Sequence, residues 1–154
     1  MSIQLRPVNK ENWKALIDLK VRDDQKGFVA SNLYSIAEMQ FGFEDEGHWD
    51  AYAFGAYDGE TPIGFLMYCY NFDHSRFQSF VMRLMIDQNF QGRGFGRQIM
   101  QQAMEIFRAE ARIKSAGISY EPENDPARKL YASFGFVETG EIVDGEMLAI
   151  VKLR

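Results

Sequence analysis

The chain has 154 residues, of which 46% are hydrophobic and 14% aromatic, so it can bury the core of one globular domain, residues 1–154. Its formal net charge of -5 argues against nucleic acid as a partner, because phosphate binding needs a basic surface. One cysteine and two histidines exclude an internal disulfide and argue against a metal site. The first residues lack an apolar signal region and no apolar run could span a bilayer, so we expect a cytoplasmic protein without a membrane partner.

The N-terminal third of the chain predicts one strand and two helices. Apolar and polar residues roughly alternate over residues 3–8, which is typical of a strand. Helical spacing follows over residues 9–21, and Asn9 is placed to cap that helix. A second helix is expected within residues 27–43.

From residue 50 onward the pattern predicts strands paired through tight turns and alternating with helices. Asp-Gly pairs at 58–59 and 144–145 are typical of hairpin turns, and Gly135 is a typical residue just after a helix end. The expected strands are 50–57, 63–70, 80–86, 116–121, 136–142 and 147–153, with helices from the glycine stretch to about 112 and from 126 to 134. The order β-α-α-β-β-β-α-β-α-β-β indicates a mixed α/β domain with one central sheet.

The glycine-rich stretch at residues 91–97, QGRGFGR, lies between a predicted strand and a predicted helix. Glycines allow a ligand close to the backbone, and a helix N-terminus offers unpaired N–H groups to a phosphate. Arg93 and Arg97 would add donors, whereas the alternative is a tight turn without a ligand. The GK[ST] ending of a P-loop is absent, and Arg97 replaces the third glycine of the dinucleotide fingerprint.

Two segments in sequence carry a family resemblance. Residues 91–96, QGRGFG, fit the Q/R-x-x-G-x-G/A motif, and residues 124–136, NDPARKLYASFGF, fit N-x-x-A-x-x-x-Y-x-x-x-GF. In this order the chain resembles the GNAT superfamily of acetyl-CoA-dependent N-acetyltransferases, and most of all its bacterial spermine/spermidine (diamine) members. The resemblance implies a GNAT-like sheet flanked by helices, and acetyl-CoA as cosubstrate.

The same resemblance implies direct acetyl transfer to a primary amine, expected to be a polyamine such as spermidine or spermine. Another amine, namely an amino acid, an aminoglycoside or a protein N-terminus, is the first alternative. A non-catalytic acyl-CoA-binding module is the second. A homodimer is expected, because homodimers are common among proteins with such folds.

The resemblance also implies roles for particular residues. Tyr131 corresponds to the general acid, and a phenol is a suitable proton donor to a leaving thiolate. Asn124 would contact the cofactor arm or simply cap a helix, and Lys129 would reach the phosphates or remain an exposed lysine. The main chain of Leu84, Met85 and Ile86 would pair with the pantetheine arm, and the pyrophosphate would lie over Gln91, Gly92, Arg93, Gly94, Phe95, Gly96 and Arg97.

The general base and the acceptor site are left open by the sequence. Met82 stands where some polyamine acetyltransferases have a carboxylate. Proton removal is therefore expected to pass through water to one of the acids Glu38, Glu44, Asp45 and Glu46, or to a backbone carbonyl. Three of those acids, Glu44, Asp45 and Glu46, are also predicted to bind the amine beside Trp49, unless the segment is a solvated loop.

Overall fold

The computed structural model describes residues 2–154. Its elements follow the predicted order, with a short extra strand and two single-turn 3-10 helices added. They are β1 (Gln4–Pro7), α1 (Trp13–Ile17), η1 (Asp23–Gln25), α2 (Asn32–Met39), β2 (Phe43–Glu44), β3 (His48–Asp58), β4 (Thr61–Tyr70), β5 (Ser79–Ile86), η2 (Gln88–Phe90), α3 (Phe95–Ala109), β6 (Ser115–Tyr120), α4 (Asp125–Ser133), β7 (Val137–Val143) and β8 (Glu146–Lys152).

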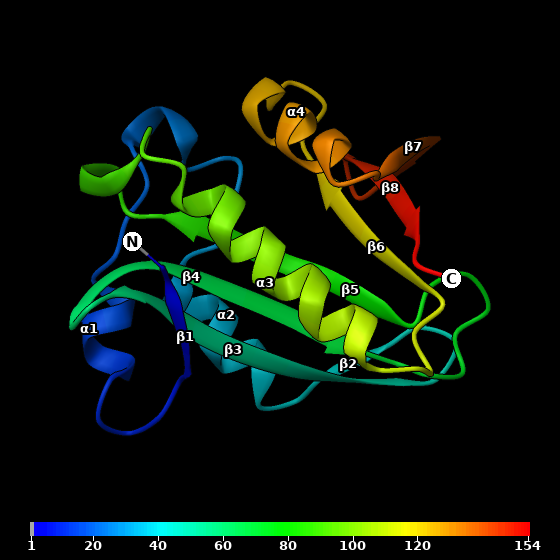
Figure 1. Cartoon of the computed structure of the whole chain (residues 1–154), viewed down its shortest axis with the longest axis horizontal. Coiled ribbons are helices and arrows are strands. Elements are labelled where there is room, and N and C mark those ends of the chain that lie inside the picture. The colour runs from blue at the N-terminus through cyan, green and yellow to red at the C-terminus, as the bar shows by residue number, and fades with distance from the viewer. Residues whose placement is uncertain (1) are drawn as a thin grey trace.

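One sheet organises the molecule, with strand order β1-β3-β4-β5-β6-β8-β7 and β2 paired to β3 (Figure 1). Every pairing is antiparallel except that of β5 with β6. The predicted Asp-Gly turns are confirmed: β3 and β4 pair up to Asp58 and Thr61, and β7 and β8 up to Val143 and Glu146. The predicted mixed α/β class with a single central sheet is therefore confirmed.

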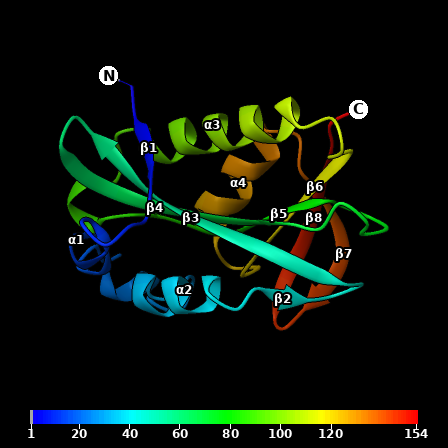
Figure 2. The same cartoon turned by 90° about the horizontal axis from the view of Figure 1, so that it is seen from below.

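Helices cover both faces of this sheet. Figure 2 shows α3 and α4 on one face and α1 and α2 on the other. Apolar residues three or four apart on α3, namely Ile99, Met100, Ala103, Met104 and Phe107, are buried in the larger core cluster. On the opposite face Ala53, Phe65, Met67 and Met85 form a second buried cluster against the α1–α2 region. None of the helices within residues 2–154 has the length and apolar character needed to cross a bilayer.

The two parallel strands separate partway along their length. β5 pairs with β6 only at Ser79, Phe80 and Val81, although β5 continues to Ile86. At the point of separation the register of β5 against β4 shifts, and Met82 has no partner in that ladder. Such a bulge bends a strand away from its neighbour. The result is a gap in the middle of the sheet, visible as the diverging β5 and β6 arrows in Figure 1.

The first helix is shorter than the sequence predicts, since α1 ends at Ile17 and not near residue 21. The backbone of Lys20 bonds elsewhere: its N–H donates to Asp87 Oδ2 at 3.0 Å, and its carbonyl accepts from the Gln88 N–H at 2.8 Å. Leu19 and Val21 still pack on the second core cluster. The apolar residues whose spacing predicted a longer helix thus lie in a non-helical segment, which is bound to the loop before α3.

Candidate active site

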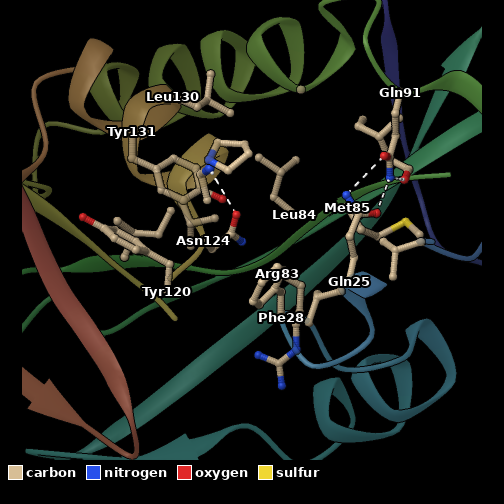
Figure 3. Close-up of a pocket in the computed structure, with 18 of the residues that line it drawn as sticks. Gln25, Phe28, Arg83, Leu84, Met85, Gln91, Tyr120, Asn124, Leu130 and Tyr131 are labelled. Carbon is tan, nitrogen blue, oxygen red and sulfur yellow. Dashed lines mark hydrogen bonds between the residues drawn. The ribbon is translucent and has the colours of Figure 1, made fainter. Parts of the chain in front are cut away.

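A cavity of about 830 Å³ opens where β5 and β6 separate. Its walls come from five parts of the chain: the α1–α2 connection, β5, the glycine loop, the end of β6 with α4, and the β7–β8 turn. Among its lining residues are Arg22, Gln25, Phe28, Met82, Arg83, Leu84, Met85, Ile86, Gln91, Gly92, Gly94, Phe95, Gly96, Ser119, Tyr120, Asn124, Tyr131, Asp144 and Glu146. In Figure 3, Tyr131 and Asn124 lie on one side of Leu84, and Gln91 and Gln25 on the other.

The glycine loop presents backbone rather than side chains to the cavity. Gly92 and Gly94 have φ values of +77° and +81°, which non-glycine residues rarely adopt. Gly94 is the N-cap of α3 and has no capping side chain, so the first N–H groups of this helix are free to bind an anion. A Cβ at either glycine would meet no protein atom within 4 Å. The loop therefore has the space, the donors and the dipole that a phosphate group requires.

Gln91 positions this loop. Its Nε2 donates to the carbonyl of Ile86 at 3.0 Å and to Gln25 Oε1 at 2.9 Å, while its Oε1 accepts from Gln25 Nε2 at 3.2 Å. Arg22 Nη1 donates to the same Gln91 oxygen at 2.9 Å. These bonds join the glycine loop to the α1–α2 connection. Nothing in the sequence marked Arg22 and Gln25, because their partner lies more than sixty positions away in the chain.

Three predicted cationic cofactor residues lie outside the cavity lining. Arg93 and Arg97 are exposed on the loop and the first turn of α3, with their guanidinium groups over the rings of Phe90 and Phe134. Lys129 is exposed on α4. Leu84, Met85, Ile86, Gln91, Gly92, Gly94, Phe95, Gly96 and Asn124, in contrast, all line the cavity.

Helix α4 directs Tyr131 into the cavity. Asn124 caps this helix by accepting from the Ala127 N–H at 3.3 Å, as the capping interpretation predicted. Tyr131 is only 8% exposed, and its ring lies 5.5 Å from that of Tyr120. Burial, and secondarily the charge of Glu146, raise the pKa of Tyr131 above that of a free phenol. A phenol in this environment keeps its proton and can donate it.

The charged groups that the structure describes at the cavity are two arginines in ion pairs with carboxylates and two carboxylates without an ion pair. Arg83 donates to Glu38 at 2.7 Å, with side chains 19% and 22% exposed, and Arg22 pairs with Asp24 at 3.2 Å. Figure 3 shows the Arg83 guanidinium pointing away from Tyr131. Within residues 2–154, Asp144 and Glu146 form no ion pair. The cavity thus has unneutralised negative charge at the β7–β8 turn.

The acids predicted to bind the amine lie elsewhere. Glu44, Asp45 and Glu46 are exposed and do not line the cavity. Glu44 Oε1 is 2.6 Å from His48 Nδ1, and Asp45 and Glu46 have carboxylate oxygens 3.4 and 3.3 Å from His74 Nε2. Their placement beside the β4–β5 loop gives the predicted substrate role no support.

His74 is engaged in structure rather than in metal binding or nucleophilic catalysis. Its Nδ1 accepts from the backbone N–H groups of Arg76 and Phe77, both at 3.2 Å, which places the ring proton on Nε2 and leaves no lone pair there for a metal. The hydroxyl of Ser75 donates to Glu46 at 2.9 Å and not to His74. Cys69 is buried, and burial raises the pKa of its thiol, so an acyl-cysteine is disfavoured.

Comparisons with known proteins agree with this geometry. Residues 13–136 match the model of the Acetyltransferase (GNAT) family. A spermine/spermidine N(1)-acetyltransferase of Bacillus subtilis (strain 168) is 27% identical over 158 residues, which cover 99% of this chain and 100% of the relative.

Two solved structures share the fold. Spermidine N-acetyltransferase from Vibrio cholerae, in complex with CoA and spermine, superposes with a TM-score of 0.75 at 17% identity, over 99% of this chain and 96% of that one. The PaiA N-acetyltransferase of Thermoplasma acidophilum, in complex with coenzyme A, gives 0.66 at 19% identity over 99% of both chains. Because the family model matches residues 13–136, which is most of the sequence, this chain belongs to the GNAT acetyltransferase family.

Proposed function

We propose that this protein transfers the acetyl group of acetyl-CoA directly to a primary amine of a polyamine such as spermidine or spermine. The observation that carries the proposal is the composition of the cavity. An anion-binding loop, the exposed edge of a separated strand, a protonated phenol and unpaired carboxylates all line one space. Each is a chemical requirement of amine acetylation by a thioester with a phosphorylated carrier.

The donor would bind along β5. The pyrophosphate would accept from N–H groups between Gly92 and Arg97, and exposed Arg93, Arg97 and Lys129 could contact phosphates beyond the cavity rim. Past Val81 the β5 main chain has no partner on the β6 side. Leu84, Met85 and Ile86 therefore offer backbone groups to the amides of the pantetheine arm, as a strand edge offers them to a peptide. Asn124, at the opposite wall, would contact the same arm.

Tyr131 would protonate the leaving sulfur. The neutral amine attacks the acetyl carbon, the C–N bond forms, and the C–S bond breaks to release a thiolate. A thiol has a pKa of about 8.5 and a phenol about 10, so a buried phenol remains protonated until the thiolate leaves. The cavity lining offers no thiol for a covalent acyl-enzyme, because the one cysteine, Cys69, is buried away from it.

A polyamine is the acceptor that the charges favour. Asp144 and Glu146 are carboxylates without a cation of their own, whereas the two cavity arginines are neutralised by Glu38 and Asp24. A polyamine has several ammonium groups, so one molecule can bind both carboxylates at once. The spermine/spermidine acetyltransferase from Bacillus subtilis, similar over its full length, supports the same acceptor class.

A panel of amines tests this function. Thiol release from acetyl-CoA would be measured with spermidine, spermine, a diamine, an amino acid, an aminoglycoside and a short peptide. We expect kcat/KM to be highest for the polyamines and to fall with ionic strength. Preference for another amine would contradict the acceptor assignment. Calorimetric binding of acetyl-CoA without turnover on any amine would instead indicate a non-catalytic acyl-CoA-binding module.

Self-association is proposed through the last strand of the sheet. β7 is an edge strand, and its Val137, Ile142 and Val143 are 69%, 55% and 50% exposed. Edge strands with apolar side chains pair readily with other chains, so a homodimer joined at β7 is expected. Light scattering should give the mass of a dimer for the native chain and of a monomer for Ile142→Lys. A native monomer at micromolar concentration would contradict this assignment.

A further inference from the structure

Glu146 is the least exposed of the three carboxylates that line the cavity, the others being Asp24 and Asp144. It begins β8 directly after the hairpin turn and is half-buried, whereas Asp144 in the turn is exposed. Ser119 Oγ donates to Glu146 Oε1 at 2.7 Å. Within residues 2–154, no lysine, arginine or histidine forms an ion pair with it.

Its position relative to Tyr131 adds a second observation. Both side chains line the cavity, one from β8 and the other from α4. The charge of Glu146 is close enough to help burial raise the pKa of Tyr131. A carboxylate and a neutral phenol in one cavity form the pair that acyl transfer to an amine needs, one group to take a proton and one to give it.

Three other carboxylates near the cavity already have partners. Glu38 is paired with Arg83 at 2.7 Å, and Asp24 with Arg22 at 3.2 Å. Glu138 accepts from Tyr120 at 3.0 Å and from Arg128 at 2.8 Å. Met82, at the bulge of β5, has no ionisable group. Among the cavity-lining residues of the described chain, 2–154, the carboxylates without a cationic partner are Asp144 and Glu146 of the β7–β8 turn.

We propose that Glu146, oriented by Ser119, binds the reacting ammonium group of the acceptor and removes its proton. This assignment rests on the proposed function. The ammonium first gives one proton to Glu146, which passes it to solvent. The neutral nitrogen then forms the C–N bond and gives its second proton to Glu146, while Tyr131 gives its own proton to the departing sulfur. Glu146 then releases this second proton to solvent, and Tyr131 regains one proton from solvent, so the reaction releases one proton in total.

Asp144 has a different part in this proposal. Because Asp144 is exposed on the turn, it attracts a second, distant ammonium group of the same polyamine molecule and does not contact the reacting nitrogen. Removing its charge should therefore raise KM for spermidine and leave kcat unchanged. Removing the charge of Glu146 should lower kcat. This division between KM and kcat is not expected if both acids merely stabilise the hairpin.

The decisive variant is Glu146→Gln, because glutamine can still accept the hydrogen bond of Ser119 while it cannot take a proton. We expect kcat/KM for spermidine to fall by about 10²-fold or more, and the Kd of acetyl-CoA to change by less than about twofold as the donor loop is untouched. An alkoxyamine acceptor of similar length, whose amino group is neutral near physiological pH, should lose far less activity than spermidine. Glu141→Gln is the matched control: it removes the same charge from the same hairpin, but Glu141 pairs with Arg76 at 2.6 Å and does not line the cavity.

Two outcomes would overturn the assignment. One is a Glu146→Gln enzyme with native kcat/KM for spermidine, and the other is an equal loss for spermidine and the alkoxyamine. If Glu146→Gln does not fold, Ser119→Ala provides the test, with a lower kcat expected at native acetyl-CoA affinity and an unchanged kcat contradicting the proposal. A native enzyme inactive on every amine would overturn the proposed function itself, whereas activity insensitive to Glu146→Gln overturns only this assignment.

Discussion

Tyr131 shows how a single side chain acquires a chemical role from its surroundings. Its ring packs near those of Tyr120 and Phe136, with centroids 5.5 and 6.3 Å away. Packing of this kind explains the burial, and burial explains the raised pKa. No described residue donates to or accepts from its hydroxyl, and Tyr131 lines the cavity. The proton is thus available to a ligand rather than committed to the fold.

Tyr131→Phe should separate catalysis from binding. The variant keeps the ring packing and loses only the proton donor, so kcat should fall by about 10²-fold or more while the Kd of acetyl-CoA stays nearly native. Steady-state thiol release and calorimetry would measure the two quantities. Tyr34→Phe, an exposed residue on α2, is the control and should behave as the native enzyme. An unchanged kcat in Tyr131→Phe would end the general-acid assignment.

The pH dependence of the native enzyme follows from the same residue. A raised pKa means that Tyr131 stays protonated above the value of about 10 for a free phenol. The neutral fraction of the amine increases over the same range. We therefore expect kcat/KM to rise with pH up to about 10 without a descending limb. A decline that begins below about pH 9, in an enzyme shown by circular dichroism to stay folded, would contradict this expectation.

At the scale of elements, the glycine loop and the start of α3 form the proposed anion site. Positive φ values at Gly92 and Gly94, on either side of Arg93, turn the chain so that the helix N-terminus faces the cavity. The bonds of Gln91 to Ile86 and Gln25 fix that turn against β5 and η1. Orientation of the loop is therefore a property of three elements together.

Gly94→Ala tests the loop against a matched glycine. Both Gly94 and Gly59 have positive φ, +81° and +62°, and a Cβ at either would meet no protein atom within 4 Å. Each substitution should cost about 1–2 kcal/mol of folding stability through backbone strain. Only Gly94→Ala places the new methyl group in the cavity, so only it should weaken acetyl-CoA binding, by roughly tenfold or more. Equal affinity of the two variants for acetyl-CoA would mean that its phosphates do not bind at Gly94.

At the scale of the molecule, the cavity exists because the sheet separates. β5 and β6 pair for three residues and then diverge, and segments that are far apart in the chain close the resulting space. A ligand that fills it contacts the N-terminal and C-terminal parts of the chain at once. Binding should consequently stabilise the whole fold and not just the loop.

Thermal unfolding measures that effect. At a free acetyl-CoA concentration roughly 100-fold above Kd, linkage predicts about 2.7 kcal/mol of stabilisation. For a chain of this size that corresponds to a rise in Tm of about 5–10 °C. Acetyl-CoA should produce the rise in native protein and Tyr131→Phe alike, and a smaller one in Gly94→Ala. Absence of any rise in native protein would contradict the donor site.

The elements were largely predictable because their determinants are local. Asp58-Gly59 and Asp144-Gly145 form the turns of two hairpins. Asn124 caps α4, and Gly135 follows the end of that helix with a φ of +94°. The prediction was wrong at the end of α1, where the backbone of Lys20 bonds to the loop at Asp87 and Gln88 instead of continuing the helix. Helical spacing cannot reveal a partner so distant in the chain.

The sequence by itself determined the family and the order of the elements, since the motifs, caps and turns that indicate them each depend on neighbours within a few positions. Only the tertiary structure decided which charges face the acceptor. It placed Glu44, Asp45 and Glu46 outside the cavity, paired Glu38 with Arg83, and placed Glu146 in the same cavity lining as Tyr131, bonded to Ser119 but without an ion pair among the described residues. The role of a carboxylate depends on which cations lie within a few ångströms of it. Such distances are set by the separation and register of strands. A local sequence pattern does not predict either of them.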